Sequence, residues 1–215
     1  IVGESGSGKS TLANIIMNLE KADSGTVLLN NKDITNIKSN KLKEIYKDIQ
    51  MVFQDAIGSF NPRFTIEESI MEYVCNLCST TEADKKHKVD NLLRMVGLSK
   101  EYKYRYPHEL SGGQCQRAAI ARALSAQPKI LVCDEATSAL DVSVQAQIVE
   151  LLKEMQEKMN ISYLFITHDL ALVSSFCDRV AVMKNGKVVE VGDAKEVINN
   201  PMDEYTKLLI KSAYF

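Results

Sequence analysis

The chain has 215 residues with 45% hydrophobic content, and its formal net charge is −2, from 26 lysines and arginines against 28 aspartates and glutamates. A chain of this size suits one domain of two lobes. The near balance of charge lacks the basic excess that would attract a phosphate backbone, so we expect no nucleic acid partner. No apolar run reaches the roughly 18 residues of a spanning helix, so we expect no membrane-crossing segment.

The first motif is a glycine-rich loop, Gly3-Glu4-Ser5-Gly6-Ser7-Gly8-Lys9-Ser10, which follows Ile1-Val2 like the end of a strand and so differs from a chance glycine-rich turn. Its glycines permit backbone angles that a Cβ would forbid, so successive N–H groups can point at phosphate oxygens. Residues 11–17 suit a helix, whose positive N-terminus would lie beneath the same phosphates. Lys9 would supply charge for the β and γ phosphates, and Ser10 a hydroxyl ligand for Mg²⁺. The nucleotide contacts are expected from Gly3, Glu4, Ser5, Gly6, Ser7, Gly8, Lys9, Ser10 and Thr11.

After the loop, the pattern changes from short strands to helices. We expect a strand at 26–29 that ends at Asn30-Asn31, a short charged helix at 41–47 and a strand at 50–53. From about 66 to 124 helical periodicity dominates, and Gly97 can end the helix that contains residues 91–96. These patterns predict an α/β core that is interrupted by a helical lobe.

The five cysteines are odd in number and scattered, without a secretory signal, which favours reduced thiols in the cytoplasm. Cys75 and Cys78 have a spacing that is also found in metal sites. The pair lacks the other two ligands of a structural zinc site, and residues 70–74 suggest a helix. We therefore interpret the cysteines as small core or surface residues, with metal binding as the alternative.

A second glycine-rich turn, Leu110-Ser111-Gly112-Gly113-Gln114, opens a helix that we expect to continue from 116 to 124. The N-terminus of this helix should also attract anions. The alternative interpretation is a plain helix cap. Since a serine before paired glycines is unusual for capping alone, the turn favours a role at phosphate.

Two carboxylates follow the apolar run Ile130-Leu131-Val132-Cys133. Four apolar residues in a row suit a strand buried on both faces of a parallel sheet, and ligands bind at the carboxyl ends of such strands. Asp134 would reach Mg²⁺ through water, and Glu135 would hold the attacking water as general base or orienting group. The alternative is that the two acids cap the next helix.

The last third of the chain has three further patterns. A long amphipathic helix is expected at 142–159, with its apolar stripe in the core. The apolar run 163–167 predicts a strand that brings His168 to the same sheet edge as Glu135, where it can donate to phosphate; a strand-end histidine with a purely structural hydrogen bond is the alternative. Asn185-Gly186 between alternating apolar residues of 180–191 predicts a hairpin.

Taken together, these motifs resemble the ATP-binding subunit of ABC transporters. Residues 110–114 are similar to the family signature, and Gln54 resembles the Q-loop glutamine, a Mg²⁺ ligand and sensor of the transmembrane subunit. Residues 138–141 resemble the D-loop, and His168 the switch histidine that contacts the γ-phosphate. The resemblance implies ATP and Mg²⁺ as cofactors, with catalytic roles for Glu135, His168 and Lys9. It also implies two ATP molecules sandwiched head to tail between two such domains. Contacts from the second copy would come from Ser111, Gly112, Gly113, Gln114 and Asp141.

The resemblance implies a single domain over 1–215: a P-loop NTPase core of RecA type at 1–65 and 125–215, a helical signature lobe at about 66–124 and a partial antiparallel β-subdomain. Such subunits usually have further residues before the phosphate loop, with strands and an aromatic that stacks on adenine. We therefore expect the sequence to be an N-terminally truncated fragment that binds ATP mainly through its phosphates.

Two segments resemble ATP-binding subunits of importers for oligopeptides, dipeptides or nickel. These are 53–66, with an Asn-Pro-Arg triplet, and 200–209. Ala56, where proline is common, and Cys115, where a long polar residue is common, depart from the pattern. The resemblance implies a location on the cytoplasmic face of the membrane. The partners would be integral membrane permease subunits, a similar but non-identical second ATPase and, indirectly, an extracytoplasmic substrate-binding protein.

Three points stay open at this stage. Phe60 and Phe64 suit either core packing or a groove for a permease helix. A soluble ABC-type ATPase of ribosomes or DNA would share the motifs, although neither a second such domain nor a long coiled coil is present. A non-enzymatic nucleotide-gated module is disfavoured because Glu135 and His168 are retained.

Overall fold

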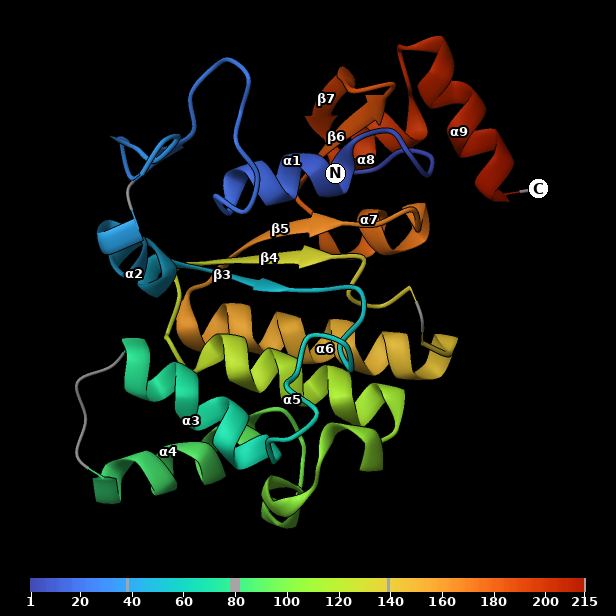
Figure 1. Ribbon diagram of the computed structural model, residues 1–215. Helices are drawn as coiled ribbons and strands as arrows, with labels where there is room; N and C mark the ends of the chain where they lie inside the picture. The colour runs from blue at the N-terminus through green and yellow to red at the C-terminus, as the bar shows by residue number, and fades with distance from the viewer. Residues whose placement is uncertain (38, 78–81, 139, 215) are drawn as a thin grey trace. The chain divides into compact units, whose positions relative to one another are not determined.

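The computed structural model describes residues 1–37, 39–77, 82–138 and 140–214. These residues form two compact units (Figure 1). The first unit contains residues 1–35 and 164–215, and the second contains residues 36–163. The phosphate loop lies in the first unit, and the signature turn and the two carboxylates lie in the second.

The centre of the second unit is a parallel pair of strands, β3 (Ile49–Val52) and β4 (Ile130–Asp134), in which Val52 lies opposite Cys133. All four residues of β3 and four of the five in β4 are buried, in keeping with the mostly apolar sequences of both strands, in which Gln50 and Asp134 are the polar members. The next strand in the sheet order is β5 (Ser162–Ile166), and the N–H of Ser162 donates to Lys129 O at 2.8 Å. The strands predicted at 50–53, 130–133 and 163–167 are therefore confirmed within one residue.

Helices cover this sheet. Figure 1 shows α5 (Gly112–Leu124) and α6 (Val142–Met159) running along one face of β3 and β4. α6 has the predicted bounds. Of its predicted apolar stripe, Ile148, Leu151, Leu152 and Met155 are buried, whereas Val144 is half-buried. The charged helix predicted at 41–47 is α2 (Ser39–Asp48), which leads directly into β3.

The predicted helical segment contains α3 (Ile66–Leu77), α4 (Glu82–Met95) and α5, with short 3₁₀ turns η1 (Lys100–Tyr104) and η2 (Pro107–Glu109) before α5. Gly97 follows α4 with φ of 71°, and the N–H of Leu98 donates to Leu93 O at 2.8 Å. The glycine therefore ends α4 in the left-handed conformation that the sequence predicted.

The loop after β3 is attached to α5 by Arg122. The guanidinium is 7% exposed, and it donates to Ser59 O at 2.7 Å and to Ser59 Oγ at 2.8 Å. It also lies 4.2 Å from the centre of the Phe60 ring. Burial lowers the pKa of Arg122. Phe60 is thus a core residue at 4% exposure, whereas Phe64 is half-buried.

In the first unit, a hairpin of β6 (Arg179–Lys184) and β7 (Lys187–Asp193) turns at Asn185 and Gly186, with φ of 48° and 76°. Two successive positive φ values define the tight turn that the Asn-Gly pair predicted. Residues Ile1 to Gly3 lie between β5 and β6, since Thr167 N donates to Ile1 O at 3.1 Å and Val2 N to Ala181 O at 2.9 Å.

Four helices complete the first unit: α1 (Lys9–Ile16), α7 (Leu170–Phe176), α8 (Ala194–Asn199) and α9 (Glu204–Tyr214). Figure 1 shows α8 and α9 beside the β6–β7 hairpin, and buried residues of α7, α8 and α9 share one core cluster with Val2, Val180 and Val182.

The strand predicted at 26–29 is shorter than expected. It is the two-residue β1 (Leu28–Leu29), paired with β2 (Lys32–Asp33) across the Asn30-Asn31 turn. Val27, just before β1, contacts the segment after β2: its N–H donates to Thr35 Oγ1 at 2.7 Å, and its carbonyl accepts the N–H of Ile34 at 2.8 Å.

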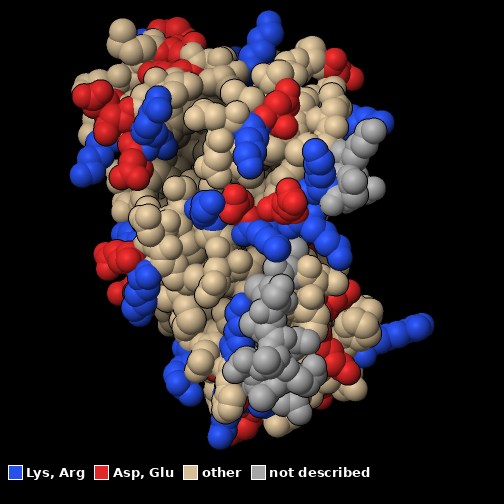
Figure 2. Space-filling view, turned by 90° about the vertical axis from the view of Figure 1, so that its left-hand side faces the viewer, with Lys and Arg blue, Asp and Glu red and all other residues tan. Residues whose placement is uncertain are grey.

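Figure 2 shows lysines and arginines interspersed with aspartates and glutamates over the face that it draws. Among the described residues, no helix combines the length and apolar composition needed to cross a membrane.

Candidate functional site

The phosphate loop of the first unit has the backbone conformation that its glycines permit. Gly8 is the N-cap of α1 with φ of 98°, and Gly6 has φ of 79°. Gly3 is constrained by space, because a Cβ there would lie 2.2 Å from Met183 O. The loop therefore leads directly into the N-terminus of an eight-residue helix, as expected for a phosphate-binding turn.

Lys9 lies against this loop. Its side chain is 5% exposed, and Nζ donates to Gly3 O at 2.8 Å, to Glu4 O at 2.9 Å and to Ser7 Oγ at 3.5 Å. These contacts place a positive charge inside the curve of the loop, next to the N–H groups that could meet an anion.

The β6–β7 hairpin is hydrogen-bonded to the phosphate loop and to the residue before it. The N–H of Gly186, in the hairpin turn, donates to Ser7 O at 2.9 Å, and Met183 N donates to Val2 O at 2.8 Å. His168 follows β5 in the same unit, and its side chain is exposed. The residue before it, Thr167, donates its N–H to Ile1 O. The end of β5 is thus a neighbour of the segment that enters the loop.

The carboxylates lie in the second unit. Asp134 ends β4 and is 8% exposed, and Glu135 is half-buried with a left-handed φ of 46°. Gln54 Nε2 donates to Glu135 Oε2 at 3.0 Å, so the structure brings together two of the residues singled out in the sequence. A residue with a side chain at positive φ is strained, and such strain is common at functional sites.

Ser138 is a further member of this cluster, and the sequence motifs assign it no role of its own. Its hydroxyl accepts from Gln54 Nε2 at 3.4 Å and donates to Glu135 O at 2.9 Å. Its spacing in the sequence could have indicated this role, because the hydroxyl of a serine three residues after Glu135 can donate back to the Glu135 carbonyl. Asp141 occupies the N-cap position of α6 without a side-chain cap, and Ala139 lies outside the described residues.

The signature turn starts α5 with a reciprocal cap. Ser111 Oγ accepts from Gln114 N at 3.3 Å, while Ser111 N donates to Gln114 Oε1 at 3.0 Å. Capping is therefore one function of this sequence. Gly113 has a packing reason as well, since a Cβ there would lie 2.6 Å from Val144 Cγ1 of α6. The paired glycines thus allow close approach to the turn.

A pocket of about 320 Å³ brings three of the motifs together within the second unit. It is lined by the segment after β3, by the first turns of α5 and by the loop after β4. The lining residues are Gln54, Asp55, Ala56, Ile57, Gly112, Gln116, Ala136 and Leu140.

The cysteines are dispersed. Cys115 and Cys133 are buried, Cys177 is half-buried and Cys75 is exposed. Burial raises the pKa of the Cys115 thiol to about 11. Cys78 lies outside the described residues, so the Cys75 and Cys78 pair stays a sequence observation.

Comparison with known proteins identifies the family of this arrangement. A family model described as ABC transporter matches residues 1–138, which include the phosphate loop, the signature turn and both carboxylates. The chain belongs to the ABC transporter family. The resemblance that the motifs indicated is therefore confirmed.

Its relatives include ATP-binding proteins of peptide transport. The chain is 48% identical to the oligopeptide transport ATP-binding protein OppF of Salmonella typhimurium, over 99% of this chain and 64% of that protein. It is 46% identical to the dipeptide transport protein DppF of Lactococcus lactis, over 99% of this chain and 69% of that protein. It is 45% identical to the glutathione import protein GsiA of Shigella boydii, over 98% of this chain but 34% of that protein.

Solved structures confirm the fold. The ATP-binding cassette MJ0796, solved as a dimer in a post-hydrolysis state with ADP and Pi, matches with a TM-score of 0.80 and 32% identity over 90% of this chain and 83% of that chain. The cbiO1 protein of Clostridium perfringens matches with a TM-score of 0.81 and 34% identity over 93% and 78% of the two chains. The predicted α/β P-loop NTPase fold is therefore correct.

Proposed function

We propose that the protein binds and hydrolyses ATP and thereby powers an importer of the ABC transporter family, with peptides as the favoured cargo. The observation that carries this proposal is the phosphate loop, in which left-handed Gly6 and Gly8 lead into α1 while Lys9 lies inside the curve. The peptide transport names of the similar proteins support the choice of cargo, and nickel stays an alternative.

The loop residues would hold the triphosphate. N–H groups between Gly3 and Thr11 would donate to phosphate oxygens, apart from those of Glu4 and Ser7, which already donate within the protein. Lys9 would turn from the loop carbonyls to the β and γ phosphates. Ser10, Gln54 and Asp134, the last through water, have the oxygen ligands that Mg²⁺ prefers. Bound Mg²⁺ would neutralise charge that develops on the phosphates.

Glu135 would act as the general base or orienting group for the attacking water. Its carboxylate already accepts the amide N–H of Gln54 at 3.0 Å, which limits the directions in which the second carboxylate oxygen can point. His168, exposed after β5, would donate to the γ-phosphate.

Two copies would complete each site. Ser111, Gly112, Gly113 and Gln114 would face the ATP held by the partner's phosphate loop, with Asp141 beside it. The N-terminus of α5 suits this role because its N–H groups and dipole favour an anion. The MJ0796 cassette, a similar protein, was solved as a dimer, which supports the pairing of two copies.

The importer assignment implies further partners. These would be permease subunits in the membrane, a second ATPase that is similar but non-identical, and a substrate-binding protein outside the cell. The protein would then lie on the cytoplasmic face of the membrane. The identity to OppF and DppF supports this arrangement.

Cysteine crosslinking tests the shared site. Ser7→Cys and Ser111→Cys would be placed on separate copies of a cysteine-depleted protein, which are then mixed with MgATP or with MgADP. We expect a disulfide between copies that depends on MgATP, together with ATPase activity of the parent protein. No disulfide between the two copies in MgATP, or a parent without ATPase activity in the assembled importer, would overturn the proposal.

A further inference from the structure

Helix α9 of the first unit contacts the phosphate loop through the side chain of Tyr205. The N–H of Glu4, the second residue of the loop, donates to the hydroxyl of Tyr205 in α9 at 3.1 Å. The two residues are 201 positions apart in the chain. Tyr205 is 7% exposed and belongs to the core cluster that contains Val2, so its ring is held in one place.

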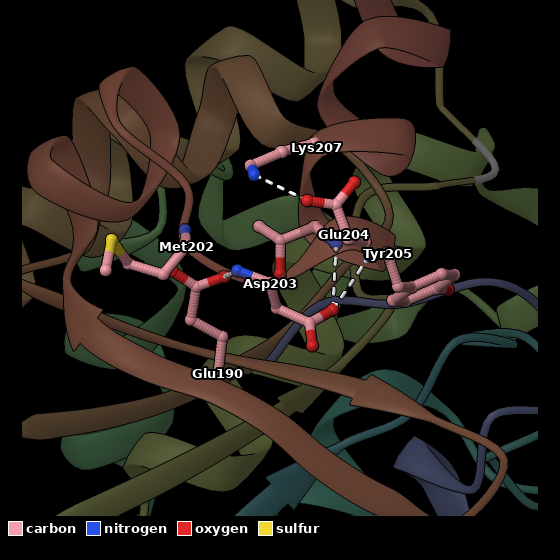
Figure 3. Close-up of polar contacts among 7 residues, drawn as sticks. Glu190, Met202, Asp203, Glu204, Tyr205 and Lys207 are labelled. Carbon is pink, nitrogen blue, oxygen red and sulfur yellow. Dashed lines mark hydrogen bonds and ion pairs between the residues drawn. The ribbon is translucent and has the colours of Figure 1, made fainter.

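The start of α9 is fixed on β7 by a second set of contacts. Figure 3 shows Glu190 of β7 below the turn that begins the helix. Its two carboxylate oxygens accept the N–H of Met202 at 2.8 Å and of Asp203 at 3.1 Å. Burial acts to raise the pKa of Glu190, but these N–H donors together with the Thr206 side chain and the Lys207 charge outweigh it, so the pKa is lowered.

Asp203 in turn caps α9. Its Oδ1 accepts the N–H of Tyr205 at 2.8 Å and of Thr206 at 3.4 Å (Figure 3). The Tyr205 backbone is therefore tied to Asp203, and the Asp203 backbone to Glu190. Lys184 Nζ, at the end of β6, lies 4.5 Å from the centre of the Tyr205 ring and covers its face.

These contacts have one consequence for the loop. A phosphate-binding loop gains affinity when its N–H groups are ordered before the anion arrives, because less conformational entropy is lost on binding. At the exit of the loop, Gly186 N already holds Ser7 O. At the entry of the loop, the Tyr205 hydroxyl of α9 holds the N–H of Glu4.

We propose that Tyr205 is a positioning residue of the nucleotide site, which orders the entry of the phosphate loop from α9 without touching the nucleotide. This inference rests on the proposed ATP-binding function and adds α9 to the site. Since the link acts on the loop and not on a base pocket, it affects any ligand with a triphosphate group.

The test compares Tyr205→Phe with Tyr163→Phe in the intact protein. Both variants keep the ring and lose one hydroxyl, and the Tyr163 hydroxyl donates to Leu152 O in the second unit. Calorimetry would measure binding of MgATP and of inorganic triphosphate. We expect Tyr205→Phe to weaken both by the same factor, roughly three- to tenfold, because one hydrogen bond to the loop is lost. Hydrolysis should show a raised KM with kcat unchanged, and Tyr163→Phe should bind both ligands like the parent.

Amide hydrogen exchange is the second measurement. The Glu4 amide should be protected in the parent protein without nucleotide, and Tyr205→Phe should remove that protection while the melting temperature stays near that of Tyr163→Phe. Glu190→Ala, which keeps the hydroxyl but releases the start of α9, should shift binding in the same direction, and its effect should not add to that of Tyr205→Phe.

The outcomes separate the inference from the proposed function. Parent-like triphosphate binding by Tyr205→Phe, or an unprotected Glu4 amide in the parent, would overturn the role of Tyr205 and leave the ATPase proposal intact. A parent protein that binds no ATP would overturn the ATPase proposal, and exchange at Glu4 would still decide the role of Tyr205. If a variant does not fold, hydrogen exchange of the Glu4 amide in the parent protein still tests the role of Tyr205.

Discussion

The side-chain amide of Gln54 donates a hydrogen bond of 3.0 Å to the carboxylate of Glu135, 81 positions later in the chain. The contact follows from the sheet register, because Val52 pairs with Cys133 and each of the two residues comes two positions later. Parallel neighbouring strands bring the residues after their carboxyl ends to one edge. Two segments that carry separate sequence motifs are thus joined in the second unit before any ligand is considered.

Replacement of Glu135 by glutamine should stop hydrolysis while ATP binding is retained. The amide has the shape of the carboxylate and can still accept from Gln54 through its oxygen, but it cannot take a proton from water. We expect turnover to fall at least about 100-fold, the scale of a lost general base. Single-turnover hydrolysis and calorimetry with MgATP would separate the two steps. Glu154→Gln, on the exposed side of α6, is the matched control; parent-like turnover in Glu135→Gln would remove Glu135 from the proposed mechanism.

Replacement of Lys9 by alanine should weaken the binding of triphosphate. The change removes a charge that is 5% exposed and three contacts within the loop. Loss of a charged hydrogen-bond donor leaves roughly 10- to 100-fold weaker binding of triphosphate. Equilibrium binding at low and moderate salt would measure it, with the exposed Lys187→Ala as control. If Lys9→Ala binds like the control, the loop does not hold the phosphates as proposed.

The sequence predicted those parts of the fold that depend on local pattern. The bounds of α6 follow from its stripe of Ile148, Leu151, Leu152 and Met155, and the β6–β7 turn follows from the positive φ that Asn185 and Gly186 accept. Sequence patterns also predicted the phosphate loop, the carboxylates after β4 and the start of α5. Each of these consists of a few consecutive residues whose types indicate their chemical role.

The rest of the arrangement depends on packing between distant segments. Nothing in residues 200–209 indicates that Tyr205 lies against Glu4, since that contact depends on how α9 is fixed to Glu190 of β7. Likewise, Arg122 looked like an ordinary polar residue of α5, but it is buried against Ser59 and Phe60. Such contacts have no periodicity, so a single sequence provides no signal for them.

Gly3 should tolerate no side chain, in contrast to Gly25. A Cβ on Gly3 would lie 2.2 Å from Met183 O, which is backbone and cannot move aside, whereas Gly25 has φ of 86° and open space around it. We expect Gly3→Ala to lower the free energy of unfolding by about 3 kcal/mol or more, and Gly25→Ala by about 1 kcal/mol from the left-handed backbone alone. Urea unfolding would measure both. Equal values for the two variants would contradict the crowding at Gly3.

Removal of the Arg122 guanidinium should destabilise the second unit. Arg122→Met retains the apolar stem but leaves Ser59 O and Oγ without their donor, so we expect a loss of about 3 kcal/mol in the free energy of unfolding. Arg122→Lys should recover part of this, because an ammonium cannot donate to both oxygens in the same planar geometry. The exposed Arg63→Met is the control and should change stability by less than about 0.5 kcal/mol. A loss in Arg122→Met no larger than in the control would show that the tie to Ser59 contributes nothing.

The buried thiol of Cys115 should make stability fall in alkaline solution. Burial raises its pKa from 9.0 to about 11, so the folded protein holds the thiol proton more tightly than the unfolded chain does. The resulting stabilisation is fully present below pH 9.0 and is lost as the pH rises to about 11. Its full size is at most about 3 kcal/mol. Because lysines and tyrosines titrate in the same range, the measurement is the difference in unfolding free energy between the parent and Cys115→Ala at several pH values. That difference should shrink above pH 9.0, and a difference that stays constant to pH 11 would mean that the thiol ionises as easily in the fold as outside it.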